Sequence, residues 1–287
     1  MTPHDYDYLR RLLRERSGLV LTADKQYLVE SRLLPVARRA GLAGLPDLVQ
    51  RLKGASAEPL AVEVTEAMTT NESFFYRDKI PFQHFRETIV PTLLAARASQ
   101  RRIRIWCAAA STGQEPYSLA MSLKEMGGAI ADWRIEILAT DLSSEVLEKA
   151  KAGIYSQFEV QRGLPIALLV RYFTQSGDTW QIAPDIRAMV QFRPLNLLND
   201  FAHLGTFDVV FCRNVLIYFD QETKASVLER IARVTDRDGY LILGAAETVV
   251  GLTESFKPVN DRRGLYAPNG AFKAKGPPTL RIVASAG

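Results

Sequence analysis

The chain has 287 residues, of which 47% are hydrophobic and 24% are charged, and this balance excludes a collagen-like or long disordered protein. Its length predicts one large domain beside a smaller one. No apolar run reaches the ~18 residues of a membrane span. The charged start MTPHDYDYLRRLLRER lacks the apolar stretch of a signal peptide, so we expect a soluble, cytoplasmic protein without membrane insertion.

Metal-ligating and cross-linking residues are scarce. Two cysteines and three histidines, scattered along the chain, leave little material for a disulfide framework or a structural zinc site, so we expect no metal. The net charge of +4 is concentrated at one end, because residues 1–53 hold ten Lys/Arg against six Asp/Glu. This asymmetry predicts an acidic partner for the N-terminal part.

The N-terminal part is predicted to be helical throughout, because apolar residues recur there at helical spacing. A first helix should end at Gly18. Thr22 or Asp24 can cap a second helix, and Gly41 should end it. Pro35 lies inside this second helix and should kink or split it.

Three parts are expected along the chain. A helical domain should span residues 1–76, with shorter helices near 46–53 and 58–69. Residues 77–99 should connect it, as one long helix, to an α/β domain over residues 100–268.

Strands and helices alternate in this second domain. Strands are predicted at 103–107, 134–140, 207–213 and 240–244, and helices at 117–126, 143–152 and 221–235. Strands that alternate with helices of about 10–15 residues predict a mainly parallel, doubly wound sheet.

Residues 156–192 interrupt this alternation and are predicted to form a small inserted β-subdomain. Gly177-Asp178 is a turn signal, and short strands are expected at 179–182 and near 189–193. The last residues, 269–287, have little periodicity and are expected to be a flexible tail.

The first predicted strand runs into small residues and then a helix, which is the usual ligand crevice of such a sheet. Ser111 or Thr112 can cap the helix that starts near Gly113. The segment is not a G-x-G-x-x-G loop, and Glu115 would repel a phosphate but suits a ligand with an ammonium group. Alternatively, Glu115 merely interacts with the helix dipole.

Polar residues follow two other predicted strands. Asp141 ends the second strand, where nucleoside-binding sheets hold ribose hydroxyls, or else it caps the next helix. Arg213 and Asn214 end a wholly apolar strand and should reach the same edge of the sheet. Tyr218, within an apolar run, can belong either to a site or to the core.

The segment TTNESFFYR joins the two domains, and interdomain junctions are favoured binding places. Asn71-Glu72-Ser73 matches a glycosylation sequon that an intracellular chain would not use. The aromatic residues 74–76 are best interpreted as packing, whereas Arg77 has no evident structural need.

Taken together, TTNESFFYR, IWCAAASTGQEPYS, ATDLS, NLL and FDVVFCRNVLIYFD resemble the CheR family of chemotaxis receptor methyltransferases. The resemblance extends to about Pro268, and the order and spacing of the motifs make it specific. It implies a Rossmann-like class I methyltransferase fold. It also implies transfer of a methyl group from S-adenosylmethionine to glutamate side chains on the cytoplasmic helical domain of chemoreceptors, with S-adenosylhomocysteine as the product.

The resemblance assigns cofactor contacts residue by residue. These are Asn71, Ser73 and Arg77 of the junction, Glu115 for the methionine ammonium, Asp141 for the ribose, and Asn196, Leu197, Asn214 and Val215 around adenine and methionine. Many members have Glu at the position of Gln114. The inserted segment also lacks a Gly-rich loop found in members that dock on a receptor's C-terminal pentapeptide, so pentapeptide tethering is not expected here.

A receptor glutamate is ionised near pH 7, so it can attack the methyl group without a general base or a metal. Positioning and exclusion of water should then provide the catalysis. Arg77 is expected to orient the acceptor carboxylate by charge-assisted bonds, and Tyr218 to line the transfer position. The sheet order of methyltransferases further implies that Cys107 and Cys212 end neighbouring strands.

The second helix is the predicted receptor-docking element. Lys25, Arg32 and Arg39 are spaced by seven residues and share one face, with Arg38 beside it. The alternative is a solvated face without a partner. For the whole chain, the alternatives are a cofactor-binding regulator without catalysis and a methyltransferase of the same fold with another acceptor. A nucleic-acid partner is not expected, because no reader motif is present.

Overall fold

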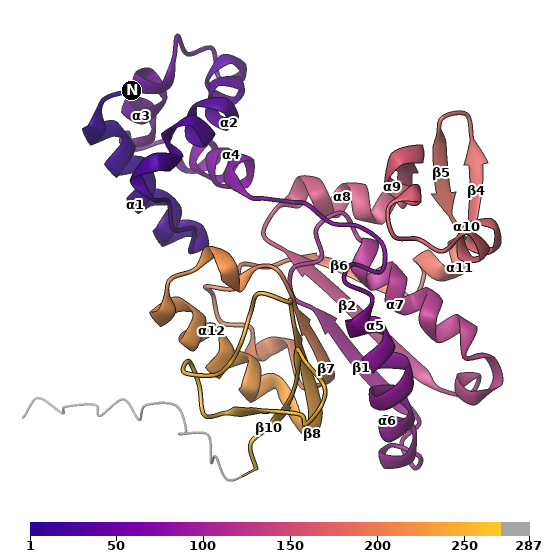
Figure 1. Cartoon of the computed structure of the whole chain (residues 1–287). Coiled ribbons are helices and arrows are strands. Elements are labelled where there is room, and N and C mark those ends of the chain that lie inside the picture. Colours follow the sequence, from indigo (N-terminus) through magenta and orange to yellow (C-terminus); the bar gives the residue numbers. More distant parts are fainter. Residues whose placement is uncertain (271–287) are drawn as a thin grey trace, which may run out of the picture.

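The computed structural model describes residues 1–270 as a helical domain joined by one linker to an α/β domain (Figure 1). The helical domain contains α1 Pro3–Ser17, α2 Gln26–Arg39, α3 Leu45–Leu52 and α4 Glu58–Met68. Their apolar faces meet in a core of their own, centred on Leu9, Leu13 and Leu33. The prediction of an all-helical N-terminal domain is confirmed.

Local sequence determines both ends of α1. The Thr2 side chain accepts a hydrogen bond from the Asp5 N–H, and the Asp5 carboxylate accepts one from the Thr2 N–H. Gly18 ends the helix in the left-handed region, with φ of 75°. The predicted end of this helix is therefore confirmed.

The predicted start of the second helix was wrong, and its predicted end is confirmed. Neither Thr22 nor Asp24 caps it: a short 3₁₀ turn precedes α2, and no side chain bonds to its first N–H groups. Pro35 does not split α2, which continues to Arg39. Gly41, with φ of 71°, ends it.

The connecting segment is helical but not a regular α-helix. It consists of α5 Ile80–His84, a π-helical turn Phe85–Ile89 and α6 Val90–Ala96. Pro91 follows the π turn and has no N–H to donate to the preceding carbonyl. The segment packs on the sheet through Phe82 and Phe85.

Seven strands form the main sheet, in the order β6-β2-β1-β7-β8-β10-β9. They are β1 Arg102–Cys107, β2 Arg134–Asp141, β6 Val190–Pro194, β7 Phe207–Cys212, β8 Thr235–Leu243, β9 Phe256–Pro258 and β10 Leu265–Pro268. The first five in this order pair in parallel, and β10 pairs antiparallel with both of its neighbours, β8 and β9. The parallel α/β fold is confirmed, whereas the antiparallel pair was not predicted.

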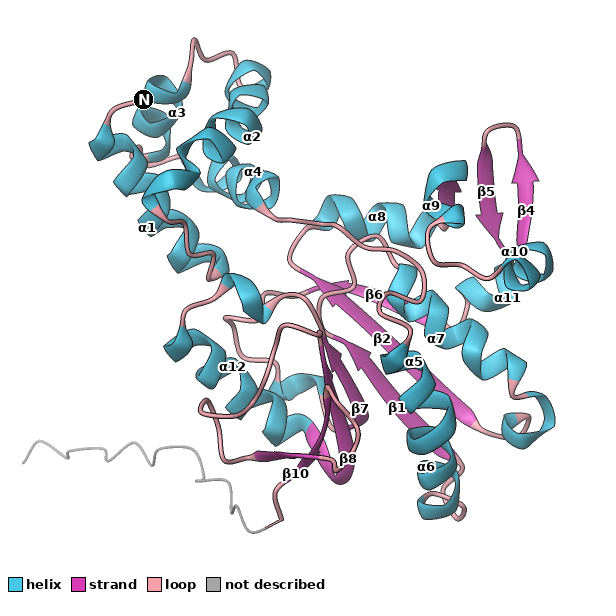
Figure 2. Cartoon of the chain, viewed as in Figure 1, coloured by secondary structure: helices cyan, strands magenta, loops and turns pink. Residues whose placement is uncertain are grey.

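Helices cover both faces of this sheet (Figure 2). α7 Gln114–Glu125 and α5 lie on one face, and α12 Gln221–Val234 lies on the other. α8 Ser144–Ala152 follows β2. Because side chains alternate along a strand, Ile105 joins the first apolar layer and Trp106 the second. β1 and β7 are paired, so Cys107 and Cys212 do end neighbouring strands.

The inserted subdomain is a three-stranded antiparallel sheet in the order β3-β5-β4. Its elements are β3 Ile154–Ser156, α9 Gln157–Gln161, α10 Ile166–Tyr172, β4 Phe173–Ser176, β5 Thr179–Ile182 and α11 Pro184–Arg187. The strand predicted near 189–193 does not belong to it, and this prediction was wrong. That segment is β6, which pairs in parallel with β2, because a short edge strand has the same periodicity in either sheet.

The predicted tail, 269–287, lies outside the described residues except for its first two. Within the described part of the chain, no helix is long and apolar enough to cross a bilayer. In the same part, no group of three or more His, Cys, Asp or Glu residues could hold a metal ion.

Candidate active site

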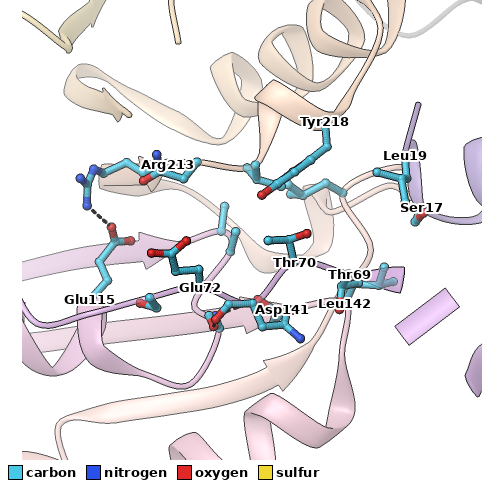
Figure 3. Close-up of a pocket in the computed structure, with 18 of the residues that line it drawn as sticks. Ser17, Leu19, Thr69, Thr70, Glu72, Glu115, Asp141, Leu142, Arg213 and Tyr218 are labelled. Atoms are coloured by element: carbon cyan, nitrogen blue, oxygen red, sulfur yellow. Dashed lines mark hydrogen bonds and ion pairs between the residues drawn. The ribbon is translucent and has the colours of Figure 1, made fainter. Parts of the chain in front are cut away.

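A pocket opens at the carboxyl edge of the parallel strands, where the helical domain meets the sheet (Figure 3). Its volume is about 990 Å³, including the space at its open mouth. It is lined by all the residues predicted for the cofactor and for catalysis, namely Asn71, Ser73, Arg77, Glu115, Asp141, Asn196, Leu197, Asn214, Val215 and Tyr218. The structure thus brings together residues that lie up to 147 positions apart in the chain.

Glu115 lies in the first turn of α7, buried at the end of β1. Gly113 precedes this helix with φ of 92°, and no side chain caps it, so the predicted capping by Ser111 or Thr112 was wrong. Instead, the Ser111 hydroxyl donates to the carbonyl of Asn71 at 2.8 Å. This bond attaches the interdomain linker to the crevice.

The Glu115 carboxylate forms a buried ion pair with Arg213, with 2.7 Å between Nη1 and Oε2 (Figure 3). Burial raises the pKa of Glu115, and the Arg213 charge acts against this rise. The sequence placed Arg213 at this edge of the sheet but gave it no role. A carboxylate that faces a pocket from such a site can bind a ligand ammonium group.

Asp141 ends β2 and is also buried. Its carboxylate accepts hydrogen bonds from the N–H groups of Ser111 at 2.8 Å and Ser143 at 3.0 Å. Burial raises the pKa of Asp141, and these backbone bonds act against the rise. Ser143, not Asp141, is the N-cap residue of α8, so the alternative role as a helix cap does not apply.

The loop after β7 has an unusual backbone that one carboxylate supports. Asn214 has φ of 57°, in the left-handed region. The Glu247 carboxylate accepts four hydrogen bonds, from the N–H groups of Asn214, Val215, Leu216 and Gly244, at 2.7 to 3.0 Å. No local sequence pattern indicates Glu247, because its contact with Asn214 spans 33 positions.

The interdomain linker supplies a cation and an aromatic ring to the pocket. The Arg77 guanidinium donates to the Glu72 carbonyl at 2.7 Å and lies 5.5 Å from the centroid of the Phe74 ring. Phe75 and Tyr76 are buried in the core of the α/β domain, as the packing interpretation predicted. Phe74 instead lines the pocket.

The helical domain forms another wall of the pocket, through Ser17, Leu19 and Met68. Its α2 face is less available than the sequence suggested. The Arg32 guanidinium donates to the carbonyls of Met68 at 2.7 Å and Thr69 at 2.8 Å. Arg39 pairs with Glu63.

Of the other two predicted docking residues, Lys25 has its Nζ 3.6 Å from Oδ2 of Asp24, and Arg38 is exposed. The structure therefore does not present the four predicted docking residues as equivalent surface charges.

The pocket differs between its two ends. Figure 3 shows the Glu115–Arg213 pair at one end and Leu19 with Leu142 at the other, with Asp141 closer to the latter. A buried carboxylate suits an ammonium group, an acid at the end of β2 suits ribose hydroxyls, and an apolar end suits a base. This arrangement fits S-adenosylmethionine, so fold and site together define a Rossmann-like methyltransferase.

Comparison with known proteins identifies the family. Residues 4–69 match the model of the CheR methyltransferase all-alpha domain, and residues 71–265 match that of the CheR methyltransferase SAM-binding domain. The chain belongs to the CheR methyltransferase family, and its cofactor is S-adenosylmethionine.

Curated relatives match over nearly the whole chain. Chemotaxis protein methyltransferase 1 of Pseudomonas aeruginosa is 43% identical over 91% of this chain and 96% of its own length. Chemotaxis protein methyltransferase Cher2 of Pseudomonas putida is 40% identical over the same shares. The chemotaxis protein methyltransferase of Vibrio parahaemolyticus is 38% identical over 92% and 96%.

Proposed function

We propose that this protein is a protein-glutamate O-methyltransferase that converts glutamate side chains of chemoreceptors to methyl esters for sensory adaptation. Membership of the CheR family and relatives named chemotaxis protein methyltransferases support this. The observation that carries the proposal is the convergence of Glu115, Asp141 and Arg77 on one pocket at the domain junction. The reaction would take place in the cytoplasm, on the helical domain of the receptor.

The residues that line the pocket suit cofactor binding. Glu115 would hold the methionine ammonium and Asp141 the ribose. The backbone at 196–197, and the backbone and side chains at 214–215, would hold the remaining polar groups. Asn71 and Ser73 would complete this set from the linker. Bound there, S-adenosylmethionine supplies a methyl group activated by its sulfonium charge.

The acceptor needs little chemical help from the protein. A glutamate carboxylate has a pKa of about 4.3 and is ionised near neutral pH, so no general base is required. The residues lining the pocket, all in the described part of the chain, include neither His nor Cys. Catalysis would then come from holding two reactants in line and excluding water.

Arg77 is the residue we assign to the acceptor carboxylate. It is the lining residue of the linker with a permanent positive charge, and its guanidinium can form two parallel bonds to a carboxylate. The methyl ester is neutral and would lose this charge-assisted interaction, which favours product release. Tyr218, on the facing loop after β7, would line the transfer position.

For receptor docking, we propose that the α2 face guides the encounter with an acidic receptor helix. Arg38 is exposed, and Lys25 lies at the start of the same helix. Long-range attraction between opposite charges speeds association without requiring high affinity. Because Arg32 and Arg39 already have partners inside the helical domain, Arg38 should contribute most.

Incubation with labelled S-adenosylmethionine and receptor cytoplasmic fragments tests the proposed function. Base-labile label on the receptor supports glutamate esterification. Binding without turnover indicates a cofactor-binding regulator, and base-stable label indicates another acceptor.

A receptor lacking its C-terminal pentapeptide tests the mode of tethering. The hairpin of the inserted subdomain is short, with β4 and β5 joined through Gly177-Asp178. We therefore expect the shortened receptor to be methylated at the rate of the full-length one.

A further inference from the structure

We propose that Arg213 is a positioning residue that links the cofactor end of the pocket to the linker turn that carries Arg77. Its guanidinium bonds to three groups: Glu115 at 2.7 Å, the Asp78 carboxylate at 2.7 Å and the backbone carbonyl of Arg77 at 2.9 Å. The side chain is only 2% exposed. One buried cation thus joins the end of β7, the start of α7 and the linker.

The first arm of this link holds a strained turn. Tyr76, Asp78 and Lys79 have φ values of 52°, 69° and 53°, and each is a non-glycine residue in the left-handed region. Such conformations persist only where the surroundings enforce them, and they cluster at functional sites. Arg213 bonds to the carbonyl of the peptide between Arg77 and Asp78 and to the Asp78 carboxylate. It therefore fixes the backbone from which the Arg77 side chain reaches the pocket.

The second arm maintains the charge of Glu115. Burial favours the neutral acid. The groups that face Glu115 are Arg213, which directly follows β7, the Cys107 thiol of β1 and, further away, Arg77. A neutral thiol cannot balance a carboxylate, so Arg213 is the main group that keeps Glu115 ionised. Only the ionised carboxylate can form an ion pair with a ligand ammonium group.

A lysine could not replace this arginine. Three acceptors on two chain segments, the start of α7 and the linker, are reached by two nitrogens of one rigid, planar group. A lysine ammonium carries the same charge on a single nitrogen and cannot span them. Arg213→Lys therefore retains the charge but removes the link.

The experiment compares three variants. Arg213→Lys should weaken S-adenosylhomocysteine binding roughly 10- to 100-fold, because it loses the charge-assisted bond that holds the Glu115 carboxylate in place, and it should lower turnover as well. Asp78→Asn removes the charged acceptor of the turn arm and leaves the Glu115 pair intact, so it should lower turnover roughly 10-fold while binding changes less than about threefold. The Asp78 side chain is 36% exposed, so this variant is expected to fold.

Arg97→Lys is the matched control. Arg97 is also a buried arginine shared by carboxylates, Asp208 and Asp238, but it lies outside the pocket. It should lower the thermal unfolding midpoint and leave binding and turnover at wild-type values.

Two results would overturn the proposal. One is folded Arg213→Lys with wild-type binding and turnover, or with the same pattern as Arg97→Lys. The other is Asp78→Asn that weakens S-adenosylhomocysteine binding as much as Arg213→Lys does, because the two arms would then not be separate. The turnover measurements rest on the proposed function, because they need a receptor as acceptor. Calorimetry of S-adenosylhomocysteine binding needs no acceptor. A failure of receptor methylation by the wild type would therefore be distinguishable from a failure of this inference.

Discussion

The side-chain amide of Asn196 donates to the backbone carbonyl of Arg16 at 2.6 Å, across the junction of the two domains. Its amide oxygen accepts from the Leu198 N–H, so the protein itself uses both ends of this side chain. Close by, the Val20 N–H donates to the Tyr218 carbonyl at 2.9 Å. These bonds hold the helical domain as a wall of the cofactor pocket.

Asn196→Ala should weaken S-adenosylhomocysteine binding by about 0.5–1.5 kcal/mol, the value of one hydrogen bond, because the domain wall loosens. Isothermal calorimetry measures this. Asn199→Ala is the control, since Asn199 is exposed and does not line the pocket. Equal affinities for the two variants would show that the contact with Arg16 has no effect on the pocket.

Glu115→Gln should weaken S-adenosylhomocysteine binding by about 2–3 kcal/mol, because the ligand ammonium loses its charged partner. Glutamine retains the size of the side chain, so the variant separates charge from packing better than alanine does. Calorimetry at pH 7.5 gives the affinity. Unchanged affinity would contradict the assignment of Glu115 to the ammonium group.

The affinity for S-adenosylhomocysteine should depend on pH in a defined direction. Burial raises the pKa of Glu115, so its carboxylate takes up a proton at a higher pH than an ordinary glutamate. Affinity should therefore be highest near neutral pH and fall as the pH is lowered through this raised pKa. Burial also raises the pKa of Asp141, so protonation of this carboxylate should lower the affinity in the same direction.

Calorimetry between pH 7.5 and 5 tests this dependence. Glu115→Gln should remove one component of the pH profile and Asp141→Asn the other. A profile that stays flat down to pH 5 would show that neither carboxyl group titrates in this range.

Arg77→Ala should lower turnover roughly 100-fold through loss of acceptor positioning, with little change in the free energy of unfolding. Arg162→Ala is a matched control, because Arg162 also contacts the Phe74 ring and pairs with Glu72, yet it does not line the pocket. Steady-state kinetics with receptor fragments measure both variants. Similar turnover in the two would remove the catalytic role from Arg77.

Arg32 and Arg38 should differ in effect, although both lie on α2. Arg38→Glu should raise the KM for receptor, more strongly as salt is lowered, and leave cofactor affinity unchanged. Arg32→Lys retains the charge but loses bonds to the Met68 and Thr69 carbonyls at the C-terminal end of α4, so it should weaken S-adenosylhomocysteine binding instead.

Receptor kinetics and calorimetry on both variants separate the two roles. If Arg32→Lys changes neither the receptor kinetics nor the S-adenosylhomocysteine affinity, the bonds from Arg32 to the Met68 and Thr69 carbonyls are not important for the pocket. If Arg38→Glu leaves receptor kinetics unchanged, α2 does not guide docking.

The sequence by itself determined the class of fold and the location of the pocket. Strand and helix periods are local properties of the backbone, so the alternation after residue 100 predicted a parallel sheet. Carboxyl ends of parallel strands share one edge, which is why Glu115 and Asp141 could be placed together. The linker residues Asn71 and Arg77 were placed at the same pocket by resemblance to the family.

Contacts between distant residues were decided only by the tertiary structure. The place of β6 in the main sheet could not be predicted from periodicity, because its partner strand, β2, lies far earlier in the chain. The bonds from Arg32 to the start of the linker could not be predicted either, because the acceptor carbonyls are 36 and 37 positions away. Periodicity carries no information on such partners.

The polar network around the pocket has the same origin. Arg213 is separated from Glu115 by 98 positions and from Asp78 by 135. Local spacing fixes which side of a strand or helix a residue occupies, but packing decides which buried charges meet. Buried charges must find partners once water is excluded, and the folded chain alone determines which partners are within reach.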